Sequence, residues 1–170
     1  MKARSRSGTA ARLARVDDRP VVGWREWIAL PTLLVDHVKA KIDSGARTSA
    51  IHAFSIKSFT DHGAPHVSFV VHPVQRRRQP AVTCVAEIRD EREVMSSNGH
   101  RERRYVIEVD ACLGGFTWPI ELTLADRDPL GFRVLLGRQA LRDRFLVDPN
   151  RSFIAGRSFA DVSTISTNKR

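Results

Sequence analysis

The chain has 170 residues, of which 42% are hydrophobic, so it is long enough to form one domain around a packed core. No run approaches the roughly 18 apolar residues of a membrane-spanning helix, and no apolar segment follows the basic N-terminus, which argues against a secretory signal. The formal net charge of +9 suits acidic or nucleic-acid partners. Cys84 and Cys112 are too few for a disulfide framework, and we expect a cytoplasmic protein.

Much of the positive charge lies at the N-terminus and in one internal loop. Residues 1–19 hold six basic and two acidic side chains among few apolar ones, which predicts a disordered basic tail. Arg76–Arg78 adds three charges to a loop over residues 73–80. Residues 157–170 return to Ser, Thr, Lys and Arg, so we expect a folded domain over residues 20–156 between two flexible tails.

The first strong pattern is a strand that ends in Asp43-Ser44-Gly45. Apolar residues alternate with lysines over residues 38–42, the period-2 pattern of a half-buried strand. The glycine lets backbone N–H groups approach the carboxylate, and the serine hydroxyl can donate a hydrogen bond. The pattern indicates an ionisable group held at a strand end, although Asp, Ser and Gly are also the commonest turn residues.

The middle of the chain contains further short strand patterns. Apolar runs predict strands over residues 54–59, 67–72 and 81–88. The charged segment 89–104 contains Ser97-Asn98-Gly99 at its centre, and Asn-Gly is a strong hairpin signal.

The last third of the chain carries the second strong pattern. Strands are expected over residues 105–110 and 117–125. Residues 132–138 form an apolar strand that ends in Gly137-Arg138, and a short helical pattern covers residues 138–145. Many short strands with one short helix predict an all-β, closed fold.

Together the two patterns resemble the retropepsin-like aspartic peptidases. That family has an Asp-Ser/Thr-Gly loop and, further along the chain, an apolar strand with Gly-Arg that supports it. More narrowly, the chain is similar to the bacterial branch labelled ATP-dependent zinc protease, or RimK-associated. The matching stretches are residues 23–26, 40–53, 121–127 and 135–141. The resemblance covers roughly residues 20–156 and implies a closed acid-protease barrel with one short C-terminal helix.

The resemblance implies that Asp43 is catalytic. Aspartic peptidases use two carboxylates that share one proton, one acting as the base on a water and the other polarising the peptide carbonyl. Because the chain offers one Asp-Ser-Gly, the implied enzyme is a homodimer in which each subunit supplies one aspartate. The supporting residues implied by the family are Ser44, Gly45 and Ala46 in the catalytic loop, and Leu136, Gly137 and Arg138 in the Gly-Arg strand.

Arg47 departs from the family pattern. In retroviral members an acidic residue stands four positions after the catalytic aspartate and pairs with the Gly-Arg arginine. Arg138 therefore needs another partner, for which Asp143 or an acidic group of the second subunit are candidates. A positive charge at this position would suit an acidic substrate chain in the cleft.

Two further segments are candidates for substrate binding. The hairpin at Ser97-Asn98-Gly99 stands between the two motifs, where retropepsins have the flap that folds over the substrate, although an ordinary surface hairpin is equally consistent. His52 could reach the cleft, but a histidine at a strand start more often makes a structural hydrogen bond. The candidate substrate-binding residues are Arg47, His52, Ser97, Asn98 and Gly99.

No metal or cofactor is expected. A zinc peptidase usually carries two histidines four apart on a helix, with a glutamate beside the first. His62 and His66 have that spacing, but Gly63 and Pro65 exclude a helix and the glutamate is absent. No Gly-rich phosphate loop of the Lys-Ser/Thr type occurs, so ATP use by this chain is not predicted.

Three functions follow from these observations. The first is an aspartic endopeptidase, for which the family's association with ATP-grasp ligases implies peptide substrates made by a ligase. The second is a non-catalytic peptide-binding or ligase-accessory module with the same fold. The third is a nucleic-acid-binding protein that uses the basic tail and Arg76–Arg78. We rank it last because no aromatic stacking set accompanies the arginines.

Overall fold

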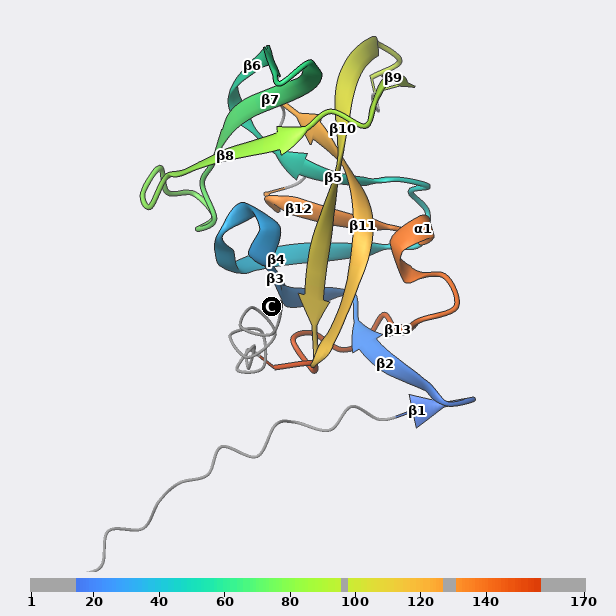
Figure 1. Ribbon diagram of the computed structural model, residues 1–170. Coiled ribbons are helices and arrows are strands. Elements are labelled where there is room, and N and C mark those ends of the chain that lie inside the picture. Colours follow the sequence, from blue (N-terminus) through green and yellow to red (C-terminus); the bar gives the residue numbers. More distant parts are fainter. Residues whose placement is uncertain (1–14, 96–97, 127–130, 157–170) are drawn as a thin grey trace, which may run out of the picture.

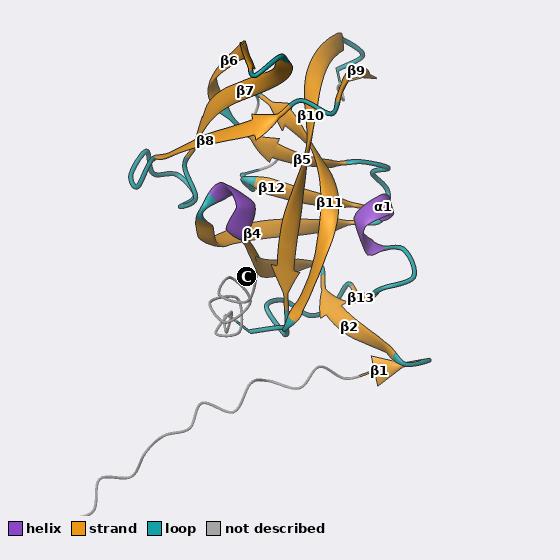
Figure 2. Cartoon of the chain, in the orientation of Figure 1, coloured by secondary structure: helices purple, strands orange, loops and turns teal. Residues whose placement is uncertain are grey.

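A computed structural model describes residues 15–95, 98–126 and 131–156 of the chain. Strands dominate these residues, as Figure 2 shows. The predicted C-terminal tail, most of the predicted N-terminal tail and Ser97 of the predicted hairpin lie outside the described residues.

Six strands close into a barrel. They follow the order β11-β5-β12-β4-β3-β10, and β10 pairs back onto β11 to complete the ring. The barrel strands are β3 (Arg25–Leu30), β4 (Val35–Asp43), β5 (Ser49–His52), β10 (Arg101–Leu113), β11 (Phe116–Ala125) and β12 (Val134–Gly137). The predicted all-β, retropepsin-like closed barrel is therefore confirmed.

Two smaller sheets and one hairpin are attached to the barrel. The first sheet contains β1 (Arg15–Val16), β2 (Arg19–Gly23) and β13 (Leu146–Asp148). The second contains β6 (Phe54–Asp61), β7 (Ala64–Val71) and β8 (Val82–Glu87), and β9 (Asp90–Met95) forms a hairpin with β10. The second sheet and the β9–β10 hairpin project from the same end of the barrel (Figure 1).

The helical elements are short. They are the 3₁₀ turn η1 (Pro31–Leu33), which the sequence analysis did not anticipate, and α1 (Arg138–Leu141). The predicted helix over 138–145 was too long, because Arg142 takes an extended conformation (ψ 136°) and Asp143 has a left-handed φ of 62°. In the described part of the chain, no helix has the length and apolar character needed to cross a bilayer.

One boundary differs from the expectation drawn from composition. Residues 15–19, which the charge pattern assigned to the basic tail, form β1 and the start of β2. Arg15 pairs with Pro20 and Val16 with Arg19. Backbone hydrogen bonds between strands do not require apolar side chains, so a charged segment can form the edge strand of a sheet.

The alternation of β4 explains how it builds both the core and the site. Val38, Ala40 and Ile42 are at most 5% exposed, whereas Lys39 and Lys41 on the other face are only half-buried. Successive side chains of a strand point to opposite faces. The face that carries the lysines therefore also presents the side chain of the residue that ends β4.

Glu26 joins the two ends of the fold. Its carboxylate is fully buried and accepts hydrogen bonds from the backbone N–H groups of Gly23 (2.6 Å), Ile154 (3.2 Å) and Ala155 (3.2 Å). Burial raises the pKa of Glu26, and these three hydrogen bonds and nearby Arg151 only partly oppose it. The C-terminal segment after β13 is thereby fastened to the start of the barrel.

We expect Glu26→Gln to lower the free energy of unfolding by about 1–3 kcal/mol, because the amide NH₂ would face a buried N–H donor in place of an acceptor. Urea unfolding followed by tryptophan fluorescence measures the change. Glu108→Gln is the control, since Glu108 is exposed on β10, and it should change stability by less than about 0.5 kcal/mol. Equal stability of both variants would contradict the anchoring role of Glu26.

Candidate active site

The two sequence motifs meet in the barrel through one parallel strand pair. β12 lies beside β4 in a register that places Leu136 opposite Ile42 and Gly137 opposite Asp43. β12 also pairs with β5 on its other side. The Asp-Ser-Gly loop, which connects β4 to β5, therefore lies directly beside the Gly-Arg segment that leads into α1.

Both oxygens of the Asp43 carboxylate accept hydrogen bonds. Oδ1 accepts from the backbone N–H groups of Gly45 (3.0 Å) and Ala46 (3.1 Å). Oδ2 accepts from the Lys41 ammonium at 3.1 Å. The Asp43 side chain is 23% exposed, so the carboxylate is fixed in place and remains accessible to solvent.

These contacts decide the charge of the carboxylate. Burial acts to raise the pKa of Asp43, but the hydrogen bond and charge of Lys41 and the two amide hydrogen bonds outweigh it and lower the pKa. In the isolated protomer Asp43 is therefore an ionised carboxylate at neutral pH.

Gly137 supports the loop because it has no side chain. A Cβ on this residue would lie 2.4 Å from the carbonyl oxygen of Thr48 and 3.0 Å from that of Ala46. Its own N–H donates to the Ser49 hydroxyl at 3.0 Å. Close approach of the two backbones needs glycine here.

The first residues of α1 continue this support. The Arg138 N–H donates to the Ala46 carbonyl at 2.7 Å, and the Gln139 N–H donates to the Arg47 carbonyl at 3.1 Å. The Arg138 guanidinium donates to the Ser44 carbonyl at 3.0 Å. The contact found for Arg138 is thus a backbone carbonyl of the Asp43 loop, whereas the sequence pattern suggested an acidic side chain.

The remaining predicted site residues lie in different surroundings. Ser44 and Arg47 are exposed on the loop. Asn98 and Gly99 belong to the turn between β9 and β10, at the upper end of β10 in Figure 1, whereas the Asp43 loop adjoins α1.

His52 is packed into the protein interior. It is 6% exposed, its Nδ1 lies 2.9 Å from the guanidinium of buried Arg133, and its ring lies 4.3 Å from that of Phe54. This arrangement contradicts a role for His52 in contacting substrate and matches the structural alternative. The local pattern could not decide this, because the partner comes from residues 81 positions later.

Lys41 is the site residue that the sequence analysis missed. The alternating pattern of residues 38–42 marks it only as a polar residue of the strand. The signal was its position two residues before Asp43, since residues i and i+2 of a strand lie on one face.

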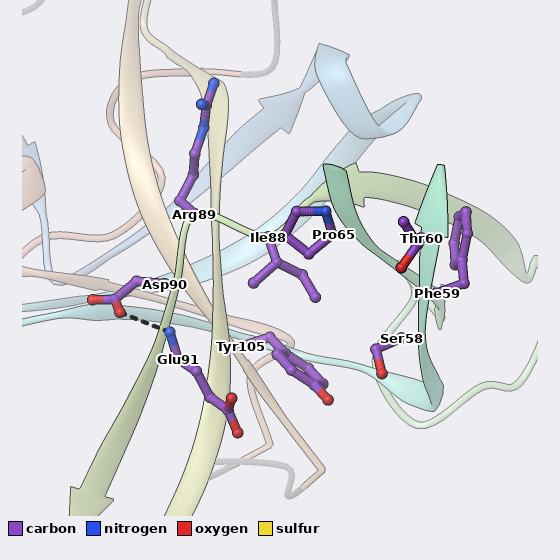
Figure 3. A pocket seen from close by; sticks show the side chains of 9 residues that line it. All are labelled: Ser58, Phe59, Thr60, Pro65, Ile88, Arg89, Asp90, Glu91 and Tyr105. Atoms are coloured by element: carbon purple, nitrogen blue, oxygen red, sulfur yellow. Dashed lines mark hydrogen bonds between the residues drawn. The ribbon is translucent and has the colours of Figure 1, made fainter. Parts of the chain in front are cut away.

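The structure contains a pocket of about 580 Å³, whose lining side chains Figure 3 shows. It opens between the β6–β7 hairpin and the segment that enters β9. Its lining residues are Ser58, Phe59, Thr60, Pro65, Ile88, Arg89, Asp90, Glu91 and Tyr105. None of these belongs to the Asp43 loop, so the pocket is not the surroundings of the candidate catalytic group.

The two histidines with zinc-like spacing occupy a hairpin, as their glycine and proline neighbours predicted. His62 lies in the turn between β6 and β7, and His66 lies in β7, where its ring stacks on Phe59. Among the residues that the structure describes, no group of three His, Cys, Asp or Glu side chains is arranged to hold a metal ion.

A family model matches most of the chain. The model described as "Retropepsin-like aspartic endopeptidase RimB", of the RimB-like family, matches residues 21–158. This range contains the Asp43 loop, the Gly-Arg strand and the complete barrel.

Curated relatives are longer proteins. A probable alpha-L-glutamate ligase of Shewanella pealeana is 48% identical over 140 residues, which cover 82% of this chain and 31% of the relative. The probable alpha-L-glutamate ligase of Parasynechococcus marenigrum is 45% identical over 136 residues, covering 80% of this chain and 29% of the relative. The chain thus spans about a third of the length of these relatives.

The fold also occurs in a solved structure. The crystal structure of Lpg0085 from Legionella pneumophila, a protein of unknown function, superposes with a TM-score of 0.67 at 24% identity. The match covers 79% of this chain and 97% of that one. At this identity the similarity concerns the fold alone.

We expect Gly137→Ala to destabilise the protein by about 3 kcal/mol or more. The new Cβ would overlap backbone atoms of Thr48 and Ala46, which cannot move aside by a change of side-chain rotamer. Gly63→Ala is the matched control: Gly63 has a φ of +81° and no heavy atom within 4 Å of the place that a Cβ would take, so only backbone strain of about 1–2 kcal/mol arises. Thermal unfolding compares the two variants. Equal losses would mean that the Gly137 contact is not a close one.

The Asp43 pKa predicts a pH dependence of stability. A lowered folded-state pKa means that ionised Asp43 stabilises the fold above its unfolded-state pKa of about 4, and that this contribution is lost as the pH falls through the lower folded value. Asp43→Asn should therefore be less stable than wild type at about pH 6 and lose much of that deficit near pH 2. Urea unfolding at both pH values tests this, and a deficit independent of pH would contradict it.

Proposed function

We propose, from the premise that this chain belongs to the RimB-like family of retropepsin-like aspartic endopeptidases, that it hydrolyses peptide bonds with Asp43. The observation that carries the proposal is the fixed, partly exposed Asp43 carboxylate at a strand end, held by the amides of Gly45 and Ala46 and supported by the Gly-Arg segment. A turn aspartate without function would not need this second layer of support.

The reaction requires two copies of this site. One protomer supplies a single carboxylate, whereas the chemistry of the class uses a pair that holds one proton. We therefore propose a homodimer in which two Asp43 loops meet across a two-fold axis. The free faces of Ser44 and Gly45, both exposed in the protomer, suit such a contact.

The proposed steps balance in atoms and protons. The ionised Asp43 takes a proton from a water as the water oxygen adds to the peptide carbonyl carbon, and the protonated Asp43 of the other copy gives its proton to the carbonyl oxygen. When the C–N bond breaks, the nitrogen takes the proton that came from the water. The Asp43 of the other copy recovers its proton from one of the two hydroxyls on the former carbonyl carbon. That carbon then becomes the carboxyl carbon of the new carboxylic acid.

The charges around Asp43 favour acidic substrates. Lys41 and Arg47 place positive charge on the same strand end and loop, and Arg47 is exposed. Relatives that contain a segment similar to this chain are named probable alpha-L-glutamate ligases. We propose glutamate-rich peptides as substrates and a ligase of this kind as the functional partner.

The decisive experiment measures cleavage of glutamate-rich peptides by wild type and Asp43→Asn between about pH 4 and 8, with products identified by mass spectrometry. We expect Asp43→Asn to lower kcat by at least about 10²–10⁴-fold, because the variant has lost the proton acceptor. Asp36→Asn, at the exposed start of the same strand, is the control and should keep full activity.

Mixing tests the shared site. If each active unit needs two Asp43 residues, only dimers of two wild-type subunits are active. After subunit exchange with excess Asp43→Asn, the activity should therefore be proportional to the square of the wild-type fraction. Activity proportional to the wild-type fraction would contradict the shared pair. A different outcome would establish a binding module. In that case dimeric wild type cleaves none of these peptides at any pH, and wild type and Asp43→Asn bind them with the same affinity.

A further inference from the structure

Lys41 forms an ion pair with the carboxylate on which the proposed reaction depends. Its ammonium lies 3.1 Å from Oδ2 of Asp43, the oxygen that the loop amides do not bind. Oδ1 is already occupied by two N–H donors, so Oδ2 is the oxygen left to meet a water or a second carboxylate. In the protomer that position is taken by the protein's own lysine.

The surrounding charges single out this pair. The positively charged side chains on the elements around the carboxylate are Lys41 on β4, its cross-strand partner Arg25 on β3, Arg47 in the loop and Arg138 on α1. The Arg25 guanidinium lies 4.6 Å from the centre of the Trp24 ring and donates a hydrogen bond to the Ser152 hydroxyl at 3.1 Å. Arg138 is directed at the Ser44 carbonyl, and Arg47 is exposed. Lys41 supplies the ion pair with Asp43, and its side chain is 26% exposed, so the ammonium can leave along its flexible stem toward solvent or a ligand.

We infer that Lys41 is a gate for the proposed reaction: an acidic substrate side chain draws its ammonium away from Asp43, and only then do the two Asp43 carboxylates share a proton. The inference rests on the proposed function. It makes Lys41 a positioning and specificity residue that acts through Asp43, because its ammonium is not required in the bond-breaking steps.

The physical reason is competition for one oxygen and one charge. Two carboxylates share a proton because their mutual repulsion favours protonation of one of them. An ammonium on each carboxylate removes that repulsion, so both stay ionised and no proton is available for the carbonyl oxygen. A substrate carboxylate offers the Lys41 ammonium an equivalent partner. When the ammonium moves to the substrate, the repulsion between the two Asp43 carboxylates returns.

The gate predicts specificity in kcat. Two peptides that differ only by Glu or Gln at one position near the scissile bond should differ in turnover, with a higher kcat for the Glu peptide. The activity of the pair is lost as the pH rises through its upper pKa. The Glu peptide should therefore stay active to a pH about one unit higher than the Gln peptide.

Lys41→Met separates the gate from simple charge binding. Without the ammonium the pair is never locked, so the variant should cleave the Gln peptide about tenfold faster than wild type near pH 7, and the two pH profiles should converge. A lysine that only binds the acidic side chain would change KM for the Glu peptide and leave kcat for the Gln peptide unaltered. Lys41→Gln repeats the test if the methionine variant does not dimerise.

Lys39→Met is the matched control. Lys39 lies on the same face of β4 and carries the same charge, but its ammonium lies over the rings of Trp27 (5.2 Å) and Phe153 (5.7 Å). Its removal should leave the Glu/Gln ratio of kcat as in wild type. An equal effect of both lysine variants would overturn the inference, because it would show a general effect of net charge.

A second readout does not depend on turnover. Titration of the Asp43 carboxyl carbon by ¹³C NMR should give a higher pKa in Lys41→Met than in wild type, while Lys39→Met leaves it unchanged. An unchanged kcat for the Gln peptide in Lys41→Met, with wild type active, overturns the gate alone. No Asp43-dependent cleavage of either peptide by wild type overturns the proposed function and the gate with it.

Discussion

The parallel pairing of β12 with β4 is the constraint on which the rest of the site depends. It brings Gly137 against the Thr48 and Ala46 carbonyls at a distance that leaves no room for a Cβ. With that contact in place, the first amides of α1 and the Arg138 guanidinium bind the carbonyls of the Asp43 loop. The loop is thus held at its own backbone carbonyls, and the Asp43 carboxylate remains partly exposed to solvent.

The two oxygens of the Asp43 side chain have different partners. Oδ1 of Asp43 closes the turn by accepting two amide N–H groups, and Oδ2 accepts from Lys41. A carboxylate satisfied on both oxygens is stable and ionised in a single protomer. In the proposed reaction Oδ2 would also face a water or a second carboxylate, so the ion pair with Lys41 would have to change when a second subunit and a substrate bind.

A second carboxylate, that of the buried Glu26, holds the two ends of the domain together. Glu26 of β3 accepts hydrogen bonds from the backbone N–H groups of Gly23 in β2 and of Ile154 and Ala155 after β13, which joins both segments to the barrel. In relatives about three times as long, the matching segment is part of a polypeptide named as a probable glutamate ligase.

By itself the sequence predicted an all-β, closed fold, because the period-2 patterns of its short strands are local properties of the chain. The type of barrel, and the expectation that the Gly-Arg strand supports the Asp-Ser-Gly loop, came from the resemblance to retropepsin-like peptidases that these two motifs carry. Tertiary structure alone decided that the Arg138 guanidinium binds a backbone carbonyl, that His52 is buried against Arg133, and that the helix ends at Leu141. Those contacts join residues up to 94 positions apart. Their geometry depends on the register of strand pairing and on the φ of single residues, which no local pattern specifies. The contact between Lys41 and Asp43 lies between the two cases: the spacing placed both on one face, but only the folded loop turned the carboxylate oxygen toward the ammonium.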